Sequence, residues 1–237
     1  TVHIVSERHE VPLFLYGAAA SRPERTVLSH LRRGEYEHFE ARLSGDDAHH
    51  TDHTRMPDLG ATEWTEKVAK SGGITVGARP ILVAYNVNVD ERGAEVSKKI
   101  GSIVRSSGRL LKSDGGGKVR SRGMLTSVQG MGVPVDELGI SQVSMNLLDV
   151  DACPLHVAFK TCESLAADHD VSLCGSEVVG LVPLQAMLDA GMFYDPKASD
   201  ERTMVAAAMD GLGLNRHHRF DPHEHIIEWA LDSEVRP

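Results

Sequence analysis

The sequence predicts an α+β fold, whose clearest part is a βαββαβ lobe with extra C-terminal helices from Arg79 onward. Apolar runs of strand length lie near 81–89, 124–131, 140–149 and 171–175. Helical spacing of apolar residues appears over 91–106 and again after Pro154. This order is the ferredoxin-like split βαβ pattern, which predicts a four-stranded antiparallel sheet with both helices on one face.

The first 79 residues carry weaker signals. Residues 11–16 read as a short buried strand, and a helix is predicted from Ser21 as N-cap, with Leu28 and Leu31 as its apolar stripe. Residues 44–73 show no convincing periodicity, so we predict a long loop there. A loop of that length in a compact domain is either functional or disordered.

The remaining connections follow from turn residues and caps. Residues 108–122 are rich in glycine and basic residues and predict a flexible loop, and residues 133–136 predict a turn. The C-terminal helices are expected at 184–193, near 199–210 and near 222–231, the last with Asp221 as N-cap.

Composition limits the classes of function. The 237 residues carry a net charge of −9, which argues against non-specific binding to nucleic acid. Three cysteines without a Cys-x-x-Cys pair favour a reduced, cytoplasmic location. No apolar run is long enough for a membrane span, so no membrane partner is expected. The chain begins at Thr1 rather than at a methionine, as a fragment or a processed form would.

Amide side chains mark the candidate binding surface. Asn86 and Asn88 point to the same side of one strand, while Gln142, Ser144 and Asn146 share a side of another. In the predicted topology these two strands are central neighbours. The side chains expected to extend this polar face onto the outer strands are Gln129, Ser172, Cys174 and Ser176. The alternative is a merely solvated face, which is common on open antiparallel sheets.

Eight segments, in order, resemble the glutamate formimidoyltransferase family. They are VPLFLYG (11–17), LRRGEYE (31–37), PDLG (57–60), VGARP running into AYNVN (76–88), VQGMG (128–132), QVSMNLLD (142–149), GSEVVGLVP (175–183) and FDP through IIE (220–228). None is decisive alone, but together they cover nearly the whole chain. Residues 1–79 are similar to the end of the family's N-terminal lobe, and residues 80–237 to its C-terminal lobe.

The resemblance implies a folate-dependent transferase that moves a formimino group from N-formiminoglutamate to tetrahydrofolate in histidine degradation. Family members clamp folate in a tunnel between two lobes and use tetrahydrofolate as co-substrate, with no metal. The segment that carries the family's catalytic histidine has no counterpart here, so no catalytic residue is assigned. A partial first lobe exposes sheet edges, from which we expect a homodimer.

The resemblance also implies the substrate-binding residues. The loop that begins at Gly60 and ends near Gly73 aligns with the family's folate-contacting segment, with a few residues inserted. The expected substrate contacts are Asp58, Gly60, Ala61, Thr62, Glu63, Trp64, Ser71, Gly72, Arg79, Asn86, Asn88, Gln142, Asn146, Ser176 and Glu177. Trp64 either stacks on a pterin or packs on the lobe surface, and Arg79 either holds a carboxylate or forms a structural ion pair.

Three motifs resemble functional sites but have a simpler structural interpretation. His53 faintly echoes the family's histidine motif, but it comes just before the PDLG segment, which aligns with a separate loop. We therefore interpret it, like His49 and His50, as a solvated loop histidine. The histidines between 217 and 225 lack metal-ligand spacing. Gly115-Gly116-Gly117-Lys118 does not match a phosphate-binding loop.

A second function remains open on the sequence. A chain without the histidine segment fits a non-catalytic folate-binding or interaction module derived from the same family. Folate binding without turnover is the property that separates this module from an enzyme.

Overall fold

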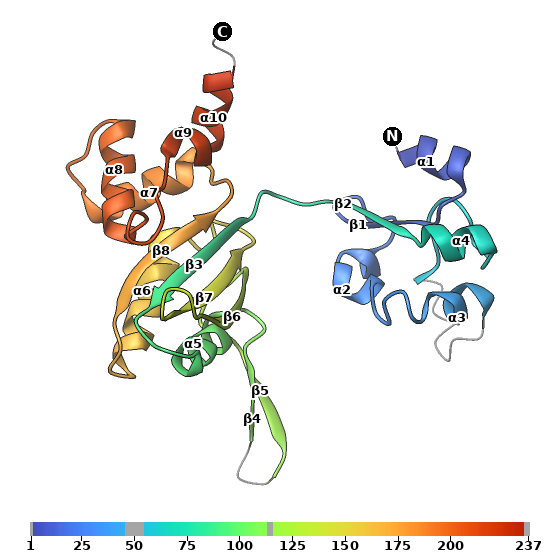
Figure 1. The fold of residues 1–237 in the computed structure, drawn as a ribbon, viewed down its shortest axis with the longest axis horizontal. Coiled ribbons are helices and arrows are strands. Elements are labelled where there is room, and N and C mark those ends of the chain that lie inside the picture. The colour runs from blue at the N-terminus through green and yellow to red at the C-terminus, as the bar shows by residue number, and fades with distance from the viewer. Residues whose placement is uncertain (1, 46–54, 113–115, 235–237) are drawn as a thin grey trace. The chain divides into compact units, whose positions relative to one another are not determined.

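The computed structural model describes residues 2–45, 55–112 and 116–234 of the chain. The chain divides into two compact units, Thr1–Arg79 and Pro80–Pro237, and each is described by itself (Figure 1).

The second unit is built on a four-stranded antiparallel sheet. Its strands are β3 (Val83–Val89), β6 (Val128–Val135), β7 (Ile140–Leu147) and β8 (Leu173–Val179). Their order across the sheet is β6-β7-β3-β8, with every neighbouring pair antiparallel. The prediction that the first and third strands of the lobe are central neighbours is confirmed.

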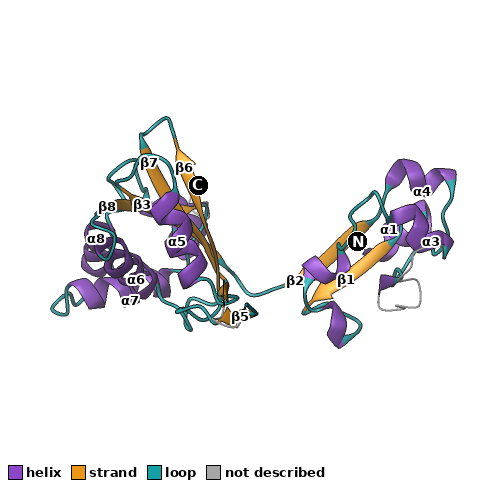
Figure 2. Ribbon diagram, turned by 90° about the horizontal axis from the view of Figure 1, so that it is seen from below, coloured by secondary structure: helices purple, strands orange, loops and turns teal. Residues whose placement is uncertain are grey.

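Two helices lie on one side of this sheet, α5 (Glu95–Val104) and α6 (Leu155–Ala167) (Figure 2). The core between them and the sheet contains fully buried aliphatic side chains from both layers, among them Val87, Ile100 and Leu155. Each such side chain stabilises the fold by about 1.5–3 kcal/mol. The βαββαβ architecture predicted from the sequence is therefore present.

Helix α5 packs against β6 almost backbone to backbone. A Cβ at Gly132 would lie 2.1 Å from the backbone nitrogen of Lys98, and one at Gly101 would lie 2.6 Å from the backbone carbon of Met131. Only glycine fits at both positions, because any side chain would push the helix off the sheet.

The N-terminus of α5 is capped from outside the helix. The Glu91 carboxylate accepts hydrogen bonds from the backbone N–H of Val96 at 2.8 Å, from that of Ser97 at 3.3 Å and from the Ser141 hydroxyl at 2.9 Å. A carboxylate at this position satisfies free N–H groups and interacts favourably with the helix dipole.

Four further helices follow the sheet: α7 (Leu184–Tyr194), α8 (Glu201–Leu212), α9 (Pro222–His225) and α10 (Ile227–Glu234). The helix predicted near 222–231 is split at Ile226, which is fully buried and forms a parallel bridge with Val182. Asp221 caps α9 as predicted, through its carboxylate and the N–H of His223. Among the described residues, none of the helices combines the length and apolarity that a bilayer-crossing segment needs.

Three boundaries differ from the prediction. Strand β6 begins at Val128 and includes the expected turn at 133–136 up to Val135, because Pro134 sits on an edge strand where its missing N–H leaves no partner unsatisfied. The expected loop 108–122 contains a hairpin, β4 (Arg109–Lys112) with β5 (Lys118–Ser121). Strand β8 continues to Val179.

The first unit surrounds a parallel strand pair, β1 (Leu13–Gly17) and β2 (Ile74–Ala78). Its helices are α1 (Val2–His9), the 3-10 turn η1 (Pro23–Arg25), α2 (Leu28–Leu31), α3 (Phe39–Ser44) and α4 (Glu66–Ser71). The single helix predicted from Ser21 is wrong: it is two short turns, and no side-chain hydrogen bond caps either. The loop predicted at 44–73 is also partly wrong, because α4 begins at a Thr65 cap whose hydroxyl accepts from the N–H of Val68.

Candidate functional site

The face of the sheet opposite α5 and α6 is lined by amide side chains. Cross-strand pairing places Asn88 opposite Gln142 and Asn86 opposite Ser144 on the two central strands. Gln129, on the outer strand β6, lies opposite Asn146 of the central strand β7. The amide residues predicted to share a face therefore do so, and we call this surface the open face.

The amides of the open face are connected by hydrogen bonds. The side-chain nitrogen of Gln142 donates to the Asn88 carbonyl oxygen at 2.9 Å and to a Glu177 carboxylate oxygen at 3.4 Å. Asn146 donates to Gln129 at 3.3 Å. Asn88 is only 1% exposed and Gln142 9%, so these are built-in contacts rather than solvated side chains. A buried amide without such partners would cost about 1–3 kcal/mol.

The carboxylate of Glu177 fixes the orientation of the two amides beside it. An ionised carboxylate only accepts hydrogen bonds, so the nitrogen of Gln142 has to face it. The same nitrogen then donates to the oxygen of Asn88. Glu177 therefore favours the amide orientation in which Gln142 donates to Asn88.

Asn86 and Ser144 complete the central part of the open face. Both are half-buried, and they lie opposite each other on β3 and β7. Within the described part of the chain their side chains have no hydrogen-bond partner, so they are available to a ligand.

Two residues of β8 do not lie where the sequence predicted. Ser176 faces the helices, where its hydroxyl accepts from Tyr85 at 2.9 Å and donates to the Leu212 carbonyl at 2.7 Å. The strand carries a bulge at which Gly175 pairs with Asn88 and Leu173 with Val89, leaving Cys174 outside the register. This bulge shifts the alternation by one residue, so Glu177 rather than Ser176 belongs to the open face.

The predicted folate-contacting loop lies in the first unit, where part of it lines a cavity of about 390 Å³. The residues around this cavity are Ser6, Glu10, Gly60, Ala61, Thr62, Glu63, Thr65 and Lys67. An exposed ion pair between Lys67 and Glu10, at 2.9 Å, crosses its wall. Ser71 and Gly72 end α4 and are not among the lining residues.

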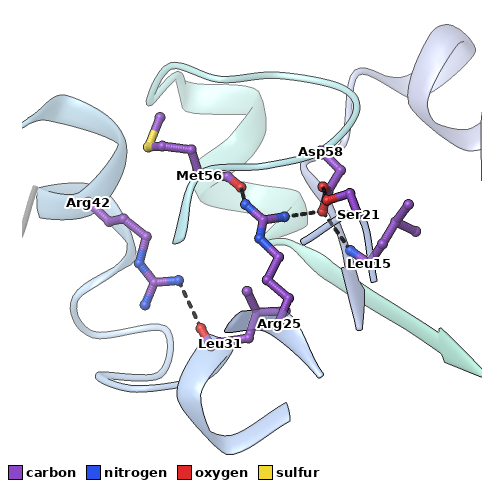
Figure 3. A network of polar contacts seen from close by, with 7 residues as sticks. All are labelled: Leu15, Ser21, Arg25, Leu31, Arg42, Met56 and Asp58. Carbon is purple, nitrogen blue, oxygen red and sulfur yellow. Dashed lines mark hydrogen bonds and ion pairs between the residues drawn. The ribbon is translucent and has the colours of Figure 1, made fainter. Parts of the chain in front are cut away.

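Asp58 holds together several segments of the first unit through hydrogen bonds and an ion pair (Figure 3). Its carboxylate accepts the Leu15 N–H at 2.7 Å, the Ser21 hydroxyl and the Arg25 guanidinium, which also donates to the Met56 carbonyl. Arg25 and Asp58 are 2% and 8% exposed. These contacts use its oxygens inside the unit and favour a structural role over the expected substrate contact.

Trp64 packs within the first unit. Its ring lies edge-on to Phe39, with centroids 5.8 Å apart, and tilted against Tyr36 at 6.3 Å. These contacts favour the packing alternative over pterin stacking.

Arg79 is exposed at the end of the first unit. No ion-pair partner for it occurs among the residues that the structure describes, and carboxylate binding by Arg79 stays a prediction.

The histidines near the C-terminus have local partners. His225 Nδ1 lies 2.7 Å from the Gly180 carbonyl, and its ring stacks on Phe220 with centroids 5.0 Å apart. No group of three or more candidate metal ligands occurs in the described ranges. His49, His50, His53 and Gly115 lie outside the described residues.

Sequence reasoning missed part of the first-unit cavity. Thr65 and Lys67 belong to α4, which lies inside the segment predicted to be a loop. The signal that could have revealed it is the threonine cap followed by the acidic residue Glu66 in the first turn.

Comparisons with known proteins match both units. Residues 84–232 match the model of the formiminotransferase domain, and residues 2–79 match that of its N-terminal subdomain. The chain is 35% identical over 231 residues to formimidoyltransferase-cyclodeaminase of Mus musculus, covering 96% of this chain and 39% of that protein. It is 35% identical over 185 residues to glutamate formimidoyltransferase of Streptococcus pyogenes serotype M1, covering 78% of this chain and 54% of that protein. The chain thus spans about two fifths to half the length of these relatives, and it belongs to the formiminotransferase domain family.

Proposed function

We propose that this chain belongs to a folate-dependent transferase that moves a formimino group from N-formiminoglutamate to tetrahydrofolate, within histidine degradation. Family membership supports the formimino transfer. The observation that carries the proposal is the open face, on which Asn86 and Ser144 have no side-chain partner among the described residues and lie beside the hydrogen-bonded pair Asn88 and Gln142.

The reaction is a nucleophilic exchange at the formimino carbon. A pterin nitrogen attacks this carbon and forms a C–N bond, and the tetrahedral intermediate then breaks the C–N bond to the glutamate nitrogen. The attacking nitrogen loses a proton and the departing glutamate nitrogen gains one, so the step is balanced without a redox partner. We assign no proton-transfer group among the described residues.

The described residues are suited to hold the reactants. Rigid strands place Asn86 and Ser144 side by side, and orientation of two reactants can lower a barrier by several kcal/mol. The cavity lined by residues 60–63 offers backbone polar groups, and Arg79 offers a guanidinium that binds a carboxylate bidentately. We propose that the folate contacts the loop and that Arg79 binds a substrate carboxylate.

The test is a coupled absorbance assay. The complete gene product is incubated with N-formiminoglutamate and tetrahydrofolate, and cyclised methenyl-folate is followed by its absorbance. The proposal predicts steady formation of this product that requires both substrates. Absence of turnover by the complete gene product contradicts it.

A non-catalytic folate-binding module is the second candidate. It is favoured by one observation: none of the four strands of the sheet contains a histidine. This candidate predicts quenching of tryptophan fluorescence by folate together with zero turnover, whereas the enzyme predicts both binding and turnover.

Location and assembly complete the proposal. The three cysteines are unpaired, which supports the cytoplasm. In the described part of the first unit, β1 and β2 form a two-stranded parallel sheet, whose edges support a homodimer. Light scattering on the purified protein tests the dimer, and a monomeric mass at micromolar concentration contradicts it.

A further inference from the structure

We propose that the Glu177 carboxylate binds the cationic amidine end of the formimino donor. This inference rests on the proposed function and assigns a chemical partner to one residue of the open face. It distinguishes the donor, N-formiminoglutamate, from the folate acceptor.

The four strands of the sheet provide no counter-charge for Glu177. The strands β3, β6, β7 and β8 contain no lysine, arginine, histidine or aspartate, and Glu177 is their one acidic residue. Within the described ranges no basic side chain forms an ion pair with it. A half-buried carboxylate in this position attracts a cation or strong N–H donors.

The Glu177 carboxylate has acceptor capacity left for such donors. One carboxylate oxygen accepts the long, 3.4 Å hydrogen bond from Gln142, and the second oxygen has no partner in the described part of the chain. Directly opposite on β3 lies Asn86, whose amide is also unpaired there. The site therefore presents acceptor oxygens next to a neutral amide.

The charge of Glu177 and its remaining acceptor capacity determine which group of the two substrates fits beside it. A protonated amidine is planar, carries a positive charge and presents N–H groups that match a carboxylate as a guanidinium does. The carboxylates of glutamate would be repelled by Glu177. The pterin ring is neutral, so its N–H groups can donate to Glu177 but lack the added attraction between opposite charges. The amidine is the substrate group that this position fits.

The first experiment compares Michaelis constants. Glu177→Gln keeps the shape and an acceptor for Gln142 but removes the charge, and Glu137→Gln in the exposed turn after β6 is the matched control. We expect Glu177→Gln to raise KM for N-formiminoglutamate at least tenfold, about 1.4 kcal/mol, with KM for tetrahydrofolate changed less than twofold. The control should match the wild type. An unchanged KM for the donor, or a rise for the folate instead, overturns the inference.

The second experiment does not need turnover. Formamidinium chloride is titrated into the isotope-labelled protein while the side-chain amide NMR signals of Gln142 and Asn88 are followed, with neutral formamide as control. We expect formamidinium alone to shift these signals, and the shift to vanish in Glu177→Gln. Shifts that persist in the variant, or that formamide reproduces, overturn the inference.

These two readouts separate the inference from the proposed function. If the protein binds formamidinium through Glu177 but shows no turnover, the proposed function is contradicted and the binding site is supported. If the wild type turns over and Glu177→Gln has the same kinetic constants, the proposed function is supported and the binding site is contradicted. If Glu177→Gln does not fold, Glu177→Asp, which keeps the charge and withdraws it by one methylene, replaces it, and a donor KM that does not rise overturns the inference.

Discussion

The side-chain amide of Gln142 donates a 2.9 Å hydrogen bond to the carbonyl oxygen of Asn88 across the two central strands of the sheet. Both residues are nearly buried, although they lie on the face that no helix of the sheet's core layer covers. The two central strands thus carry a pair of hydrogen-bonded amides at buried positions of the open face. Aliphatic side chains are the usual residues at buried strand positions.

Replacing Gln142 by methionine tests this pair. The methionine fills a similar volume but cannot donate, so the buried oxygen of Asn88 loses its partner. We expect a loss of about 1–3 kcal/mol in the free energy of unfolding, measured by urea denaturation. Gln129→Met, on the exposed edge strand, is the control and should cost less than about 0.5 kcal/mol. Equal effects of the two changes contradict a built-in pair.

The buried ion pair of the first unit makes a second prediction. Asp58→Ala removes the carboxylate that pairs with the Arg25 guanidinium, which is 2% exposed. Breaking a buried pair in this way typically costs about 3–5 kcal/mol. The sequence holds two tryptophans, Trp64 and Trp229, so urea unfolding followed in a Trp229→Phe background reports on the first unit.

The control for Asp58→Ala is Glu66→Ala, which removes an exposed ion pair with Lys70. We expect a loss of about 0.5 kcal/mol or less for this variant. A first unit that unfolds at the same urea concentration with Asp58→Ala as with Glu66→Ala would show that Asp58 is not structural, and would restore it as a candidate for substrate contact.

A pH-dependent contribution is expected from Glu91. Partial burial acts to raise its pKa, but the hydrogen bonds from the Val96 N–H, the Ser141 hydroxyl and the Ser97 N–H outweigh burial and lower the pKa below the ordinary value of 4.5. Because the folded-state pKa is the lower one, this stabilisation is complete above about pH 5 and is lost as the pH falls through the folded-state value.

Glu91→Gln measures that contribution. At pH 7 we expect the variant to unfold at lower urea concentration by about 1 kcal/mol, the usual worth of a helix cap. Near pH 3 the two proteins should converge. A difference that is the same at both pH values argues against a role for the charge.

The cysteines give a prediction on chemical reactivity. Burial raises the pKa of Cys153 to about 11, and burial together with the neighbouring Cys153 raises that of Cys162 to about 12. Since the thiolate is the reactive form, both should resist a disulfide reagent at pH 8 in the folded protein. Mass spectrometry after brief labelling should find Cys174 modified first, and all three modified in urea. Early labelling of Cys162 contradicts the core as described.

The lobe of residues 80–237 was largely predictable because its signals are periodic. Strands with fully buried alternate residues such as Val83, Tyr85 and Val87 follow a two-residue period, and α5 and α6 follow a helical one. The order of these elements then determined which strands are neighbours, and with it the pairing of Asn86 and Asn88 with Ser144 and Gln142.

The errors have local physical causes. The bulge at Gly175, with φ of 125°, moved Ser176 to the helix side, and strand alternation alone contains no sign of it. In the first unit, Arg25 and Asp58 are charged residues that became buried only because they pair over 33 positions of sequence. Such a pairing depends on tertiary structure and leaves no periodic trace.

The account depends most directly on the open face being where the substrates are held. The decisive measurement is kcat/KM of the complete gene product in the coupled methenyl-folate assay, for the wild type and for Asn86→Leu, with unfolding temperatures recorded for both. The account predicts turnover by the wild type and a loss of tenfold or more in Asn86→Leu at an unchanged unfolding temperature. Full activity in Asn86→Leu, or no activity in the wild type, contradicts it.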